Sequence, residues 1–183
     1  MRIIKEETQA VIVDIQERLM PAMNEREEFE KRALMLIRGL RLLEVPMMIT
    51  QEYTKGLGRS IPEVYEAAGT EEYFDKHAFC STREPHILQK LEERKAEGRK
   101  TVIVCGTEAH VCVLQTCIGL KEAGFDPVLV VDAIASRRES DKQAALWRAM
   151  QEGILLTTTE SLLFELTVDS NNPKFREISR LVK

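Results

Sequence analysis

The sequence predicts an α/β protein in three layers, a parallel sheet with helices on both faces. Three observations predict it. Short apolar runs rich in β-branched residues alternate with amphipathic segments of helical period. The runs are apolar at nearly every position, as strands buried on both faces are. The chain has 183 residues, enough for a substantial core without a metal or disulfide. A single domain spanning residues 1–183 is therefore expected.

Six runs are predicted to be strands, because each is rich in apolar residues and most are bounded by glycine, proline or polar residues. In chain order they are QAVIVDI at 9–15, PMMIT at 46–50, a short strand near Phe74, TVIVCG at 101–106, DPVLVVDAIAS at 126–136 and ILLTTT at 154–159. The stretch QEYTKGLGRSIPE at 51–63 carries Gly56, Gly58 and Pro62 and is predicted to be a loop, long enough to be functional.

Helices are predicted where apolar residues recur every three or four positions. They are expected at 24–44, 84–100, 110–124, 140–153, 160–166 and 172–182. Asn24 and Ser140 are the expected N-caps, and Gly98 and Gly124 are expected to end their helices. Spare apolar residues in the last two helices are expected to pack against another chain or against their own domain.

Composition excludes several classes of protein. The formal net charge is −4, which argues against a large nucleic-acid-binding surface and leaves a small basic patch open. No run is long enough to span a bilayer, and MRIIKEETQ lacks the apolar core of a secretory signal, so a cytoplasmic protein is expected. The four cysteines form no CxxC pair, so they are expected to be reduced thiols.

Three reactive side chains follow predicted strands. Asp14 lies at the end of the first strand, Lys76 follows the strand near Phe74, and Cys112 lies in the first turn of the helix after VIVCG. Ligands of parallel sheets bind outside the carboxyl ends of the strands. We therefore expect these three side chains to share one cleft.

A nucleophilic thiol would use these neighbours. A free thiol is mostly protonated at pH 7. A helix N-terminus and the ammonium of Lys76 are expected to lower the pKa of the Cys112 thiol, and Asp14 is expected to take its proton. The backbone N–H groups of Glu108 and Cys112 are expected to stabilise an oxyanion, with Gly106 allowing a sharp turn.

Structural roles stay open for each residue at this point. Cys112 is equally interpretable as a small core residue, Asp14 as a cap, and Lys76 as a surface lysine. Cys105 and Cys117 are expected in the core, whereas Cys80 lies near the proposed site. His110 is expected to be structural or to lie at the rim of the site. His77 and His86 are expected in loops or at the surface.

The chain resembles the isochorismatase-like cysteine hydrolase superfamily from about residue 8 to about residue 165. GTEAHVCV carries the resemblance most specifically, and QEYTKGLG is closest to the isochorismatase-domain-containing subgroup. The motifs are AVIVDIQERLMP at 10–21, TQEYTKGLG at 50–58, DKHAFCS at 75–81, VIVCGTEAHVCVLQT at 102–116 and VVDAIASR at 130–137. The resemblance implies a Rossmann-like, six-stranded parallel sheet.

The resemblance also implies the site. The catalytic triad of the superfamily corresponds to Asp14, Lys76 and Cys112, and its cis peptide bond to Thr107–Glu108. The substrate pocket is expected to include Gln16, Tyr53 and Phe79, with residues 134–138 as further candidates. Gln16 is expected either to offer its amide to the substrate or to cap a turn. Tyr53 is expected to be a pocket wall or an oligomer contact.

Two departures from the family pattern bear on activity. Nicotinamidases of the superfamily hold a metal with an Asp and several His after the second strand, but QEYTK at 51–55 has no histidine. No metal and no cofactor are expected. Ala109 stands where relatives often have threonine. Isochorismate hydrolases lack the cysteine, so its presence favours attack on a carbonyl or related carbon over vinyl-ether hydrolysis.

The expected function is hydrolysis of a small amide or related C–N bond through a covalent thioester, by a homo-oligomer without membrane or nucleic-acid partners. The alternative is a non-catalytic protein of the same fold that binds a metabolite or partner, or a redox-active thiol protein. The loop at 51–60 is expected to close its own site or to contact a neighbouring subunit.

Overall fold

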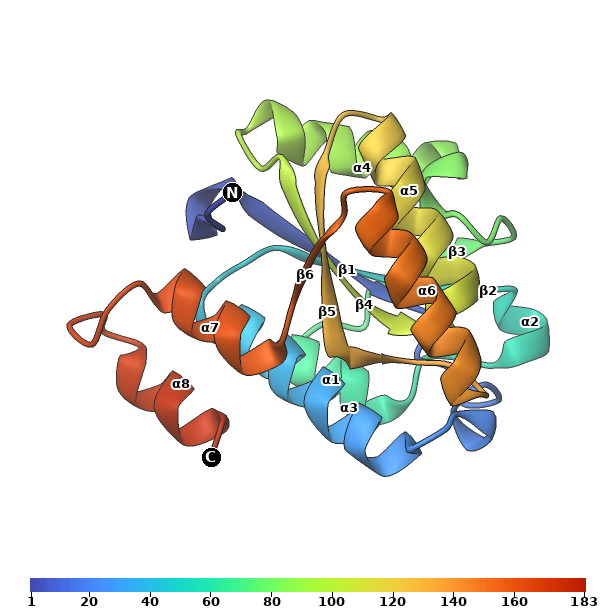
Figure 1. Cartoon of the computed structure of the whole chain (residues 1–183), viewed down its shortest axis with the longest axis horizontal. Coiled ribbons are helices and arrows are strands. Elements are labelled where there is room, and N and C mark those ends of the chain that lie inside the picture. The colour runs from blue at the N-terminus through green and yellow to red at the C-terminus, as the bar shows by residue number, and fades with distance from the viewer.

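A computed structural model describes residues 1–183. All six strands pair in parallel into one sheet in the order β3-β2-β1-β4-β5-β6. The strands are β1 (Thr8–Val13), β2 (Met47–Glu52), β3 (Phe74–Lys76), β4 (Thr101–Thr107), β5 (Asp126–Ala135) and β6 (Leu155–Thr157). Helices cover both faces (Figure 1), which confirms the predicted α/β class and the six-stranded parallel sheet.

Eight α-helices connect and flank the strands. They are α1 (Arg26–Leu42), α2 (Thr54–Leu57), α3 (Pro62–Ala68), α4 (Pro85–Ala96), α5 (Leu114–Glu122), α6 (Glu139–Gln151), α7 (Thr159–Thr167) and α8 (Phe175–Leu181). A π-helical turn, Ala109–Val113, precedes α5, and 3₁₀ turns lie at Lys5–Glu7, Met20–Ala22 and Ser81–Arg83. None of the helices is both long and apolar enough to cross a bilayer.

Alternating side chains of the four central strands, β1, β2, β4 and β5, enter two different cores. Ala10 and Ile12 of β1 face the core that includes α1, α3, α7 and α8, whereas Val11 and Val13 face the core of α4, α5 and α6. Both faces of the strand are therefore buried, which explains why its sequence is apolar at successive positions. Leu163 of α7 and Ile178 of α8 enter the first core, so the terminal helices pack on their own chain.

Several sequence-based boundaries were wrong. The predicted loop at 51–63 contains the end of β2, all of α2 and the start of α3. These elements were missed because the partly exposed segment with two glycines lacks a clear apolar period. Asn24 does not cap α1, since Glu25 precedes the helix in a left-handed conformation. Ser140 lies inside α6, which begins at Glu139. A single domain spanning 1–183 stays a prediction.

Gly106 of β4 pairs with Val13 of β1, and we predict that alanine is not tolerated there. Its φ is +118°, and a Cβ would lie 1.9 Å from the carbonyl oxygen of Val13. Gly106→Ala should lower the free energy of unfolding by about 3 kcal/mol or more, because a backbone atom cannot move aside cheaply. Urea denaturation measures this.

Gly98→Ala is the matched control for this prediction. Gly98 also has positive φ, at +97°, but a Cβ there meets nothing within 4 Å. It should cost only about 1 kcal/mol, the cost of a left-handed residue with a side chain. Equal losses for the two variants would contradict the predicted steric role of Gly106.

Candidate active site

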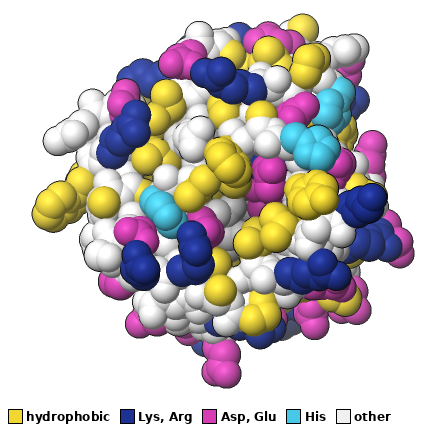
Figure 2. All heavy atoms as spheres, turned by 90° about the vertical axis from the view of Figure 1, so that its right-hand side faces the viewer, with side chains coloured by type: hydrophobic (Ala, Val, Ile, Leu, Met, Phe, Trp, Pro, Cys, Tyr) yellow, Lys and Arg dark blue, Asp and Glu magenta, His cyan; other side chains and the backbone are white.

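The reactive residues lie at the carboxyl ends of β1 and its neighbours. From β1 the chain adds β2 and β3 on one side of the sheet and then β4, β5 and β6 on the other, so the topological switch point lies between β1 and β4. Ligands of open α/β sheets bind at such a switch point. Asp14 follows β1, and Cys112 follows β4 in the π-helical turn. Figure 2 looks at the side of the molecule that carries α2, where acidic side chains lie among hydrophobic side chains and histidines.

A buried cluster of charges forms the centre of this site. Lys76 Nζ lies 2.7 Å from Asp14 Oδ2 and 2.7 Å from Glu52 Oε2. The side chains of Asp14 and Lys76 are fully buried, and that of Glu52 is 11 % exposed. Thr50 Oγ1 donates to Asp14 Oδ1 at 2.8 Å. The ends of three adjacent strands thus bring two carboxylates to one ammonium.

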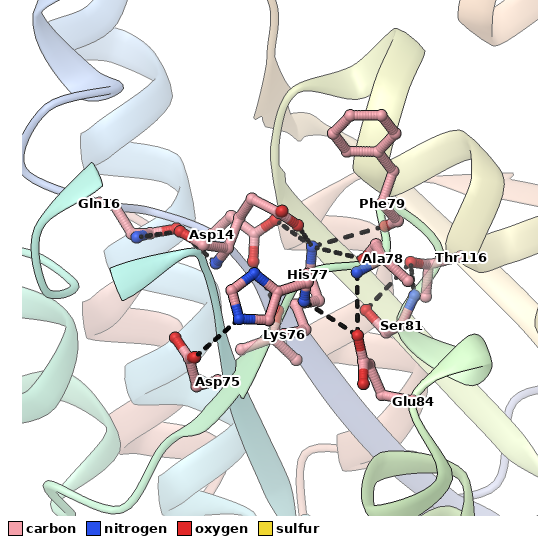
Figure 3. A network of polar contacts seen from close by, with 12 residues as sticks. Asp14, Gln16, Asp75, Lys76, His77, Ala78, Phe79, Ser81, Glu84 and Thr116 are labelled. Atoms are coloured by element: carbon pink, nitrogen blue, oxygen red, sulfur yellow. Dashed lines mark hydrogen bonds and ion pairs between the residues drawn. The ribbon is translucent and has the colours of Figure 1, made fainter. Parts of the chain in front are cut away.

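The loop after β3 completes the surroundings of the ammonium. Lys76 Nζ lies 3.3 Å from the carbonyl oxygen of Ala78 and 3.5 Å from that of Phe79 (Figure 3). Glu84 Oε1 accepts hydrogen bonds from the backbone N–H groups of His77 and Ala78, both at 2.9 Å. These contacts fix the loop and hence the carbonyl groups that face Lys76.

Cys112 lies beside the two carboxylates. One oxygen each of Asp14 and Glu52 and the sulfur of Cys112 lie within 4.8 Å of one another. Asp14 Oδ2 is enclosed, and although it pairs with Lys76 it accepts no well-directed hydrogen bond. A lone pair of this oxygen therefore remains available for the thiol proton. Cys112 is 7 % exposed, so the sulfur is only narrowly accessible.

The pKa shifts correct one sequence-based expectation. Burial raises the pKa of the Cys112 thiol, the Asp14 carboxylate raises it further, and Lys76 only partly offsets these effects. The expected lowering of the Cys112 pKa is therefore wrong, because burial and Asp14 act in the opposite direction. Burial opposes the charge of Lys76, but the neighbouring carboxylates of Asp14 and Glu52 help to raise the Lys76 pKa to about 12. Burial raises the pKa of Asp14, against the opposing effect of Lys76.

The turn between β4 and Cys112 is held by side chains from two sides. The Thr107–Glu108 peptide bond is cis. Thr107 Oγ1 donates to the carbonyl oxygen of Asp14 at 2.6 Å, and Glu108 Oε2 accepts from the backbone N–H and the Nε of Arg137, at 3.1 and 3.0 Å. The backbone N–H of Glu108 donates to no acceptor in the protein. It therefore remains available to a ligand.

His110 and the remaining cysteines have structural surroundings. His110 Nδ1 lies 3.0 Å from Ser136 Oγ, which ties the same turn to the end of β5. Burial raises the pKa of Cys105 to about 12 and also raises that of Cys117. Cys80 is buried and contacts Thr82. Cys112 is thus the cysteine that this geometry places among ionised groups.

The three expected substrate contacts occupy different positions. Gln16 is fully buried. Its Nε2 donates to the carbonyl oxygens of Glu52 and Gly58, and its Oε1 accepts from the N–H of Glu52. This arrangement supports the capping role rather than a substrate contact. Tyr53 is 46 % exposed and Phe79 is 53 % exposed. In Figure 3 the ring of Phe79 points away from Lys76.

Glu52 is the residue that sequence reasoning missed. The sequence-based prediction considered only histidine as a metal ligand after β2 and assigned no role to Glu52 at the end of that strand. The available signal was its position beside Asp14 on adjacent parallel strands. The carboxylates of Asp14 and Glu52 and the Cys112 sulfur are donors that a metal ion could use. Lys76 Nζ already contacts both carboxylates, so these residues do not fit a metal unless the ammonium is displaced.

The model of the isochorismatase domain family matches residues 8–161. The chain belongs to the isochorismatase family. This agrees with the motifs around Asp14, Lys76 and Cys112, all of which lie inside the matched region.

Relatives of this family member include isochorismatase domain-containing protein 1 of Danio rerio, which is 36% identical over 172 residues, 93% of this chain. The chain spans only 59% of the length of that protein.

Two solved structures are also similar. The MAR1 ribonuclease of Caenorhabditis elegans has a TM-score of 0.90 and 34% identity, covering 100% of this chain and 92% of that one. YcaC from Pseudomonas aeruginosa, solved with hexane-2,5-diol and covalent acrylamide, has a TM-score of 0.89 and 26% identity, covering 97% of this chain and 89% of that one.

Proposed function

We propose that this isochorismatase-family protein hydrolyses a small amide or related C–N bond through a thioester on Cys112. The observation that carries the proposal is the grouping of the Cys112 sulfur with Asp14 and Glu52 within 4.8 Å, beside an ammonium 2.7 Å from each carboxylate. A thiol, a base and a cation in one enclosed site are the groups that covalent catalysis requires. The covalent acrylamide in the YcaC structure supports a reactive nucleophile in this fold.

Acylation begins with transfer of the thiol proton to Asp14 Oδ2 as the sulfur attacks the carbonyl carbon. The S–C bond forms, and the carbonyl electrons move to the oxygen, which accepts hydrogen bonds from the N–H groups of Glu108 and Cys112. The C–N bond then breaks, and Asp14 returns the proton to the leaving nitrogen. A carboxyl group with a raised pKa suits both proton transfers.

Hydrolysis of the thioester reuses the same groups. Asp14 takes a proton from water, the resulting hydroxide attacks the thioester carbon, and the S–C bond breaks. The sulfur then regains its proton from Asp14. Lys76 keeps its charge throughout because its pKa is raised to about 12. Its role is to hold the Asp14 carboxylate and to offset negative charge as the sulfur gives up its proton.

Trapping of the intermediate tests the proposal. The protein is mixed with a panel of small amides and matched esters, quenched in acid and digested. We expect an acyl mass increment on the peptide that contains Cys112, removable by hydroxylamine as thioesters are. An increment on Cys80, or hydrolysis with Cys112 never acylated under single-turnover conditions, would contradict covalent catalysis at this residue.

The amide and ester panel, together with a parallel reaction with peroxide, separates the rival functions. A non-catalytic binding protein would leave every amide and ester intact. A redox-active thiol would react with peroxide without the need for Asp14 or Lys76.

Assembly into a homo-oligomer is part of the proposal. It is supported by the exposed side chains of Trp147 and Met150, which are 68 % and 54 % exposed on α6, and size-exclusion chromatography with light scattering tests it.

A further inference from the structure

We propose that Glu52 selects the substrate by charge, so that the hydrolysed compound is neutral or cationic near its scissile bond. This inference rests on the proposed function and concerns the same site. The charges of Asp14, Glu52 and Lys76 beside Cys112 do not balance. Asp14 and Glu52 supply two carboxylates and Lys76 supplies one ammonium, 2.7 Å from each, while a thiol of ordinary pKa is mostly uncharged at neutral pH. One negative charge is left without a buried partner.

Glu52 is the member of the charge cluster that a ligand can reach. The Asp14 and Lys76 side chains are fully buried, but that of Glu52 is 11 % exposed. Its Oε2 contacts Lys76, whereas its Oε1 accepts no hydrogen bond from the protein and is not among the enclosed polar atoms. An oxygen with a free lone pair therefore lies within reach of a compound bound at the sulfur, and it favours an N–H or ammonium donor.

Basic side chains near the site do not cancel this charge. Arg137 pairs with Glu108 at 3.0 Å. His77 and His110 each lie 4.0 Å from a carboxylate, of Asp75 and Asp141 respectively. Lys55 and Arg138, in neighbouring segments, are exposed, so solvent and salt screen their charges. A carboxylate or phosphate on a ligand would thus meet a cluster with a net negative charge where the dielectric constant is low.

The proposal defines the substrate class. Amides that carry an amine, an amidine or a second uncharged amide fit the site, whereas dicarboxylates and polyanions such as RNA are disfavoured. The name of the Caenorhabditis elegans relative raises RNA as a substrate for that protein. For this chain, the net negative charge of the site argues against RNA as a substrate.

Charged alkylating reagents test the idea without knowledge of the substrate. Iodoacetamide is neutral and iodoacetate is anionic, and both form an S–C bond with loss of iodide while the thiol proton passes to Asp14. The rate of Cys112 modification by each is followed by mass spectrometry, and the ratio is normalised to that for free glutathione. We expect wild-type Cys112 to disfavour iodoacetate by about tenfold or more, and Glu52→Gln to remove most of that preference.

Two variants serve as controls. Glu93→Gln removes the same formal charge from an exposed position on α4 and should leave the ratio unchanged. Glu52→Asp keeps the charge and should keep the preference, which separates charge from packing if Glu52→Gln perturbs the fold. A ratio that is the same in wild type and Glu52→Gln would overturn the inference, and so would loss of the preference in Glu93→Gln.

Substrate kinetics give the second arm. Amides matched in size but ending in an ammonium, a hydroxyl or a carboxylate are compared by kcat/KM. Glu52→Gln should lower the cationic-to-neutral ratio and raise the anionic-to-neutral ratio, each about tenfold. If no amide is acylated onto Cys112, the proposed function fails while the alkylation ratio still tests Glu52. If neutral amides turn over and neither ratio changes, the charge inference alone fails.

Discussion

Replacement of Cys112 by alanine should lower kcat/KM for amide hydrolysis by about 10⁴- to 10⁶-fold, the size of loss that follows removal of a nucleophile from a catalytic triad. The reason is that the sulfur makes the first attack on the amide carbon, and no other side-chain nucleophile is grouped with Asp14 and Lys76 to replace it. Initial rates of product formation, measured by chromatography on the best amide of the panel, check the prediction. The fold should survive, because the side chain is small and its neighbours remain.

Cys80→Ser is the matched control for Cys112→Ala. The Cys80 sulfur contacts the Thr82 hydroxyl at 3.1 Å, a contact that serine also makes. This variant should keep kcat/KM within about twofold of wild type. Comparable losses in the two variants would point to a general effect of thiol removal, and full activity in Cys112→Ala would exclude Cys112 as the nucleophile.

Lys76→Met should lower the free energy of unfolding at pH 7 by about 3–5 kcal/mol, the usual cost of removing one partner from a buried ion pair. The variant leaves the carboxylates of Asp14 and Glu52, with 0 % and 11 % exposed side chains, without their ammonium. Urea denaturation followed by circular dichroism measures the loss. It should be accompanied by loss of amide hydrolysis.

The double variant Asp14→Asn, Lys76→Met distinguishes charge imbalance from a packing defect. Removal of one carboxylate together with the ammonium should recover a large part of the lost stability, because the two residues interact directly. If the double variant is less stable than Lys76→Met by the full cost of Asp14→Asn alone, the two side chains are not energetically coupled and the ion-pair explanation fails.

The contribution of Lys76 should also depend on pH. Its pKa rises from 10.5 to about 12 on folding, so the stabilisation is fully present below pH 10.5 and is lost as the pH rises through about 12. One pKa unit corresponds to about 1.4 kcal/mol, so the raised pKa of Lys76 contributes about 2 kcal/mol to the free energy of unfolding. The stability difference between wild type and Lys76→Met should therefore shrink over this interval, with both proteins measured in parallel to cancel other titrations.

The sequence located much of the candidate site because strand ends are readable. Asp14 closes an apolar run and Cys112 follows another, and parallel strands place such ends at one edge. The side chain of Lys76 was harder, since only a short strand marks it, yet it lies in the centre of the cluster. Glu52 was missed for a different reason: its importance depends on a contact with Lys76, 24 residues further along the chain.

Expectations that depended on burial were the least secure. The sequence suggested a thiolate at Cys112, but sequence does not show that this residue is buried, at 7 % exposed, and that its sulfur lies beside two carboxylates. For Gln16 the sequence left two roles open. Its fully buried amide is bonded to the backbone of Glu52 and Gly58, as a structural residue would be.

The sequence by itself determined the sheet, the two layers of helices and the edge where reactive groups gather, because burial on both faces makes the central strands apolar at successive positions. Only the tertiary structure decided the protonation and charge of that edge. Those properties depend on distances of a few ångströms between groups far apart in the chain and on their exclusion from water, since Coulomb energies grow steeply as the local dielectric constant falls.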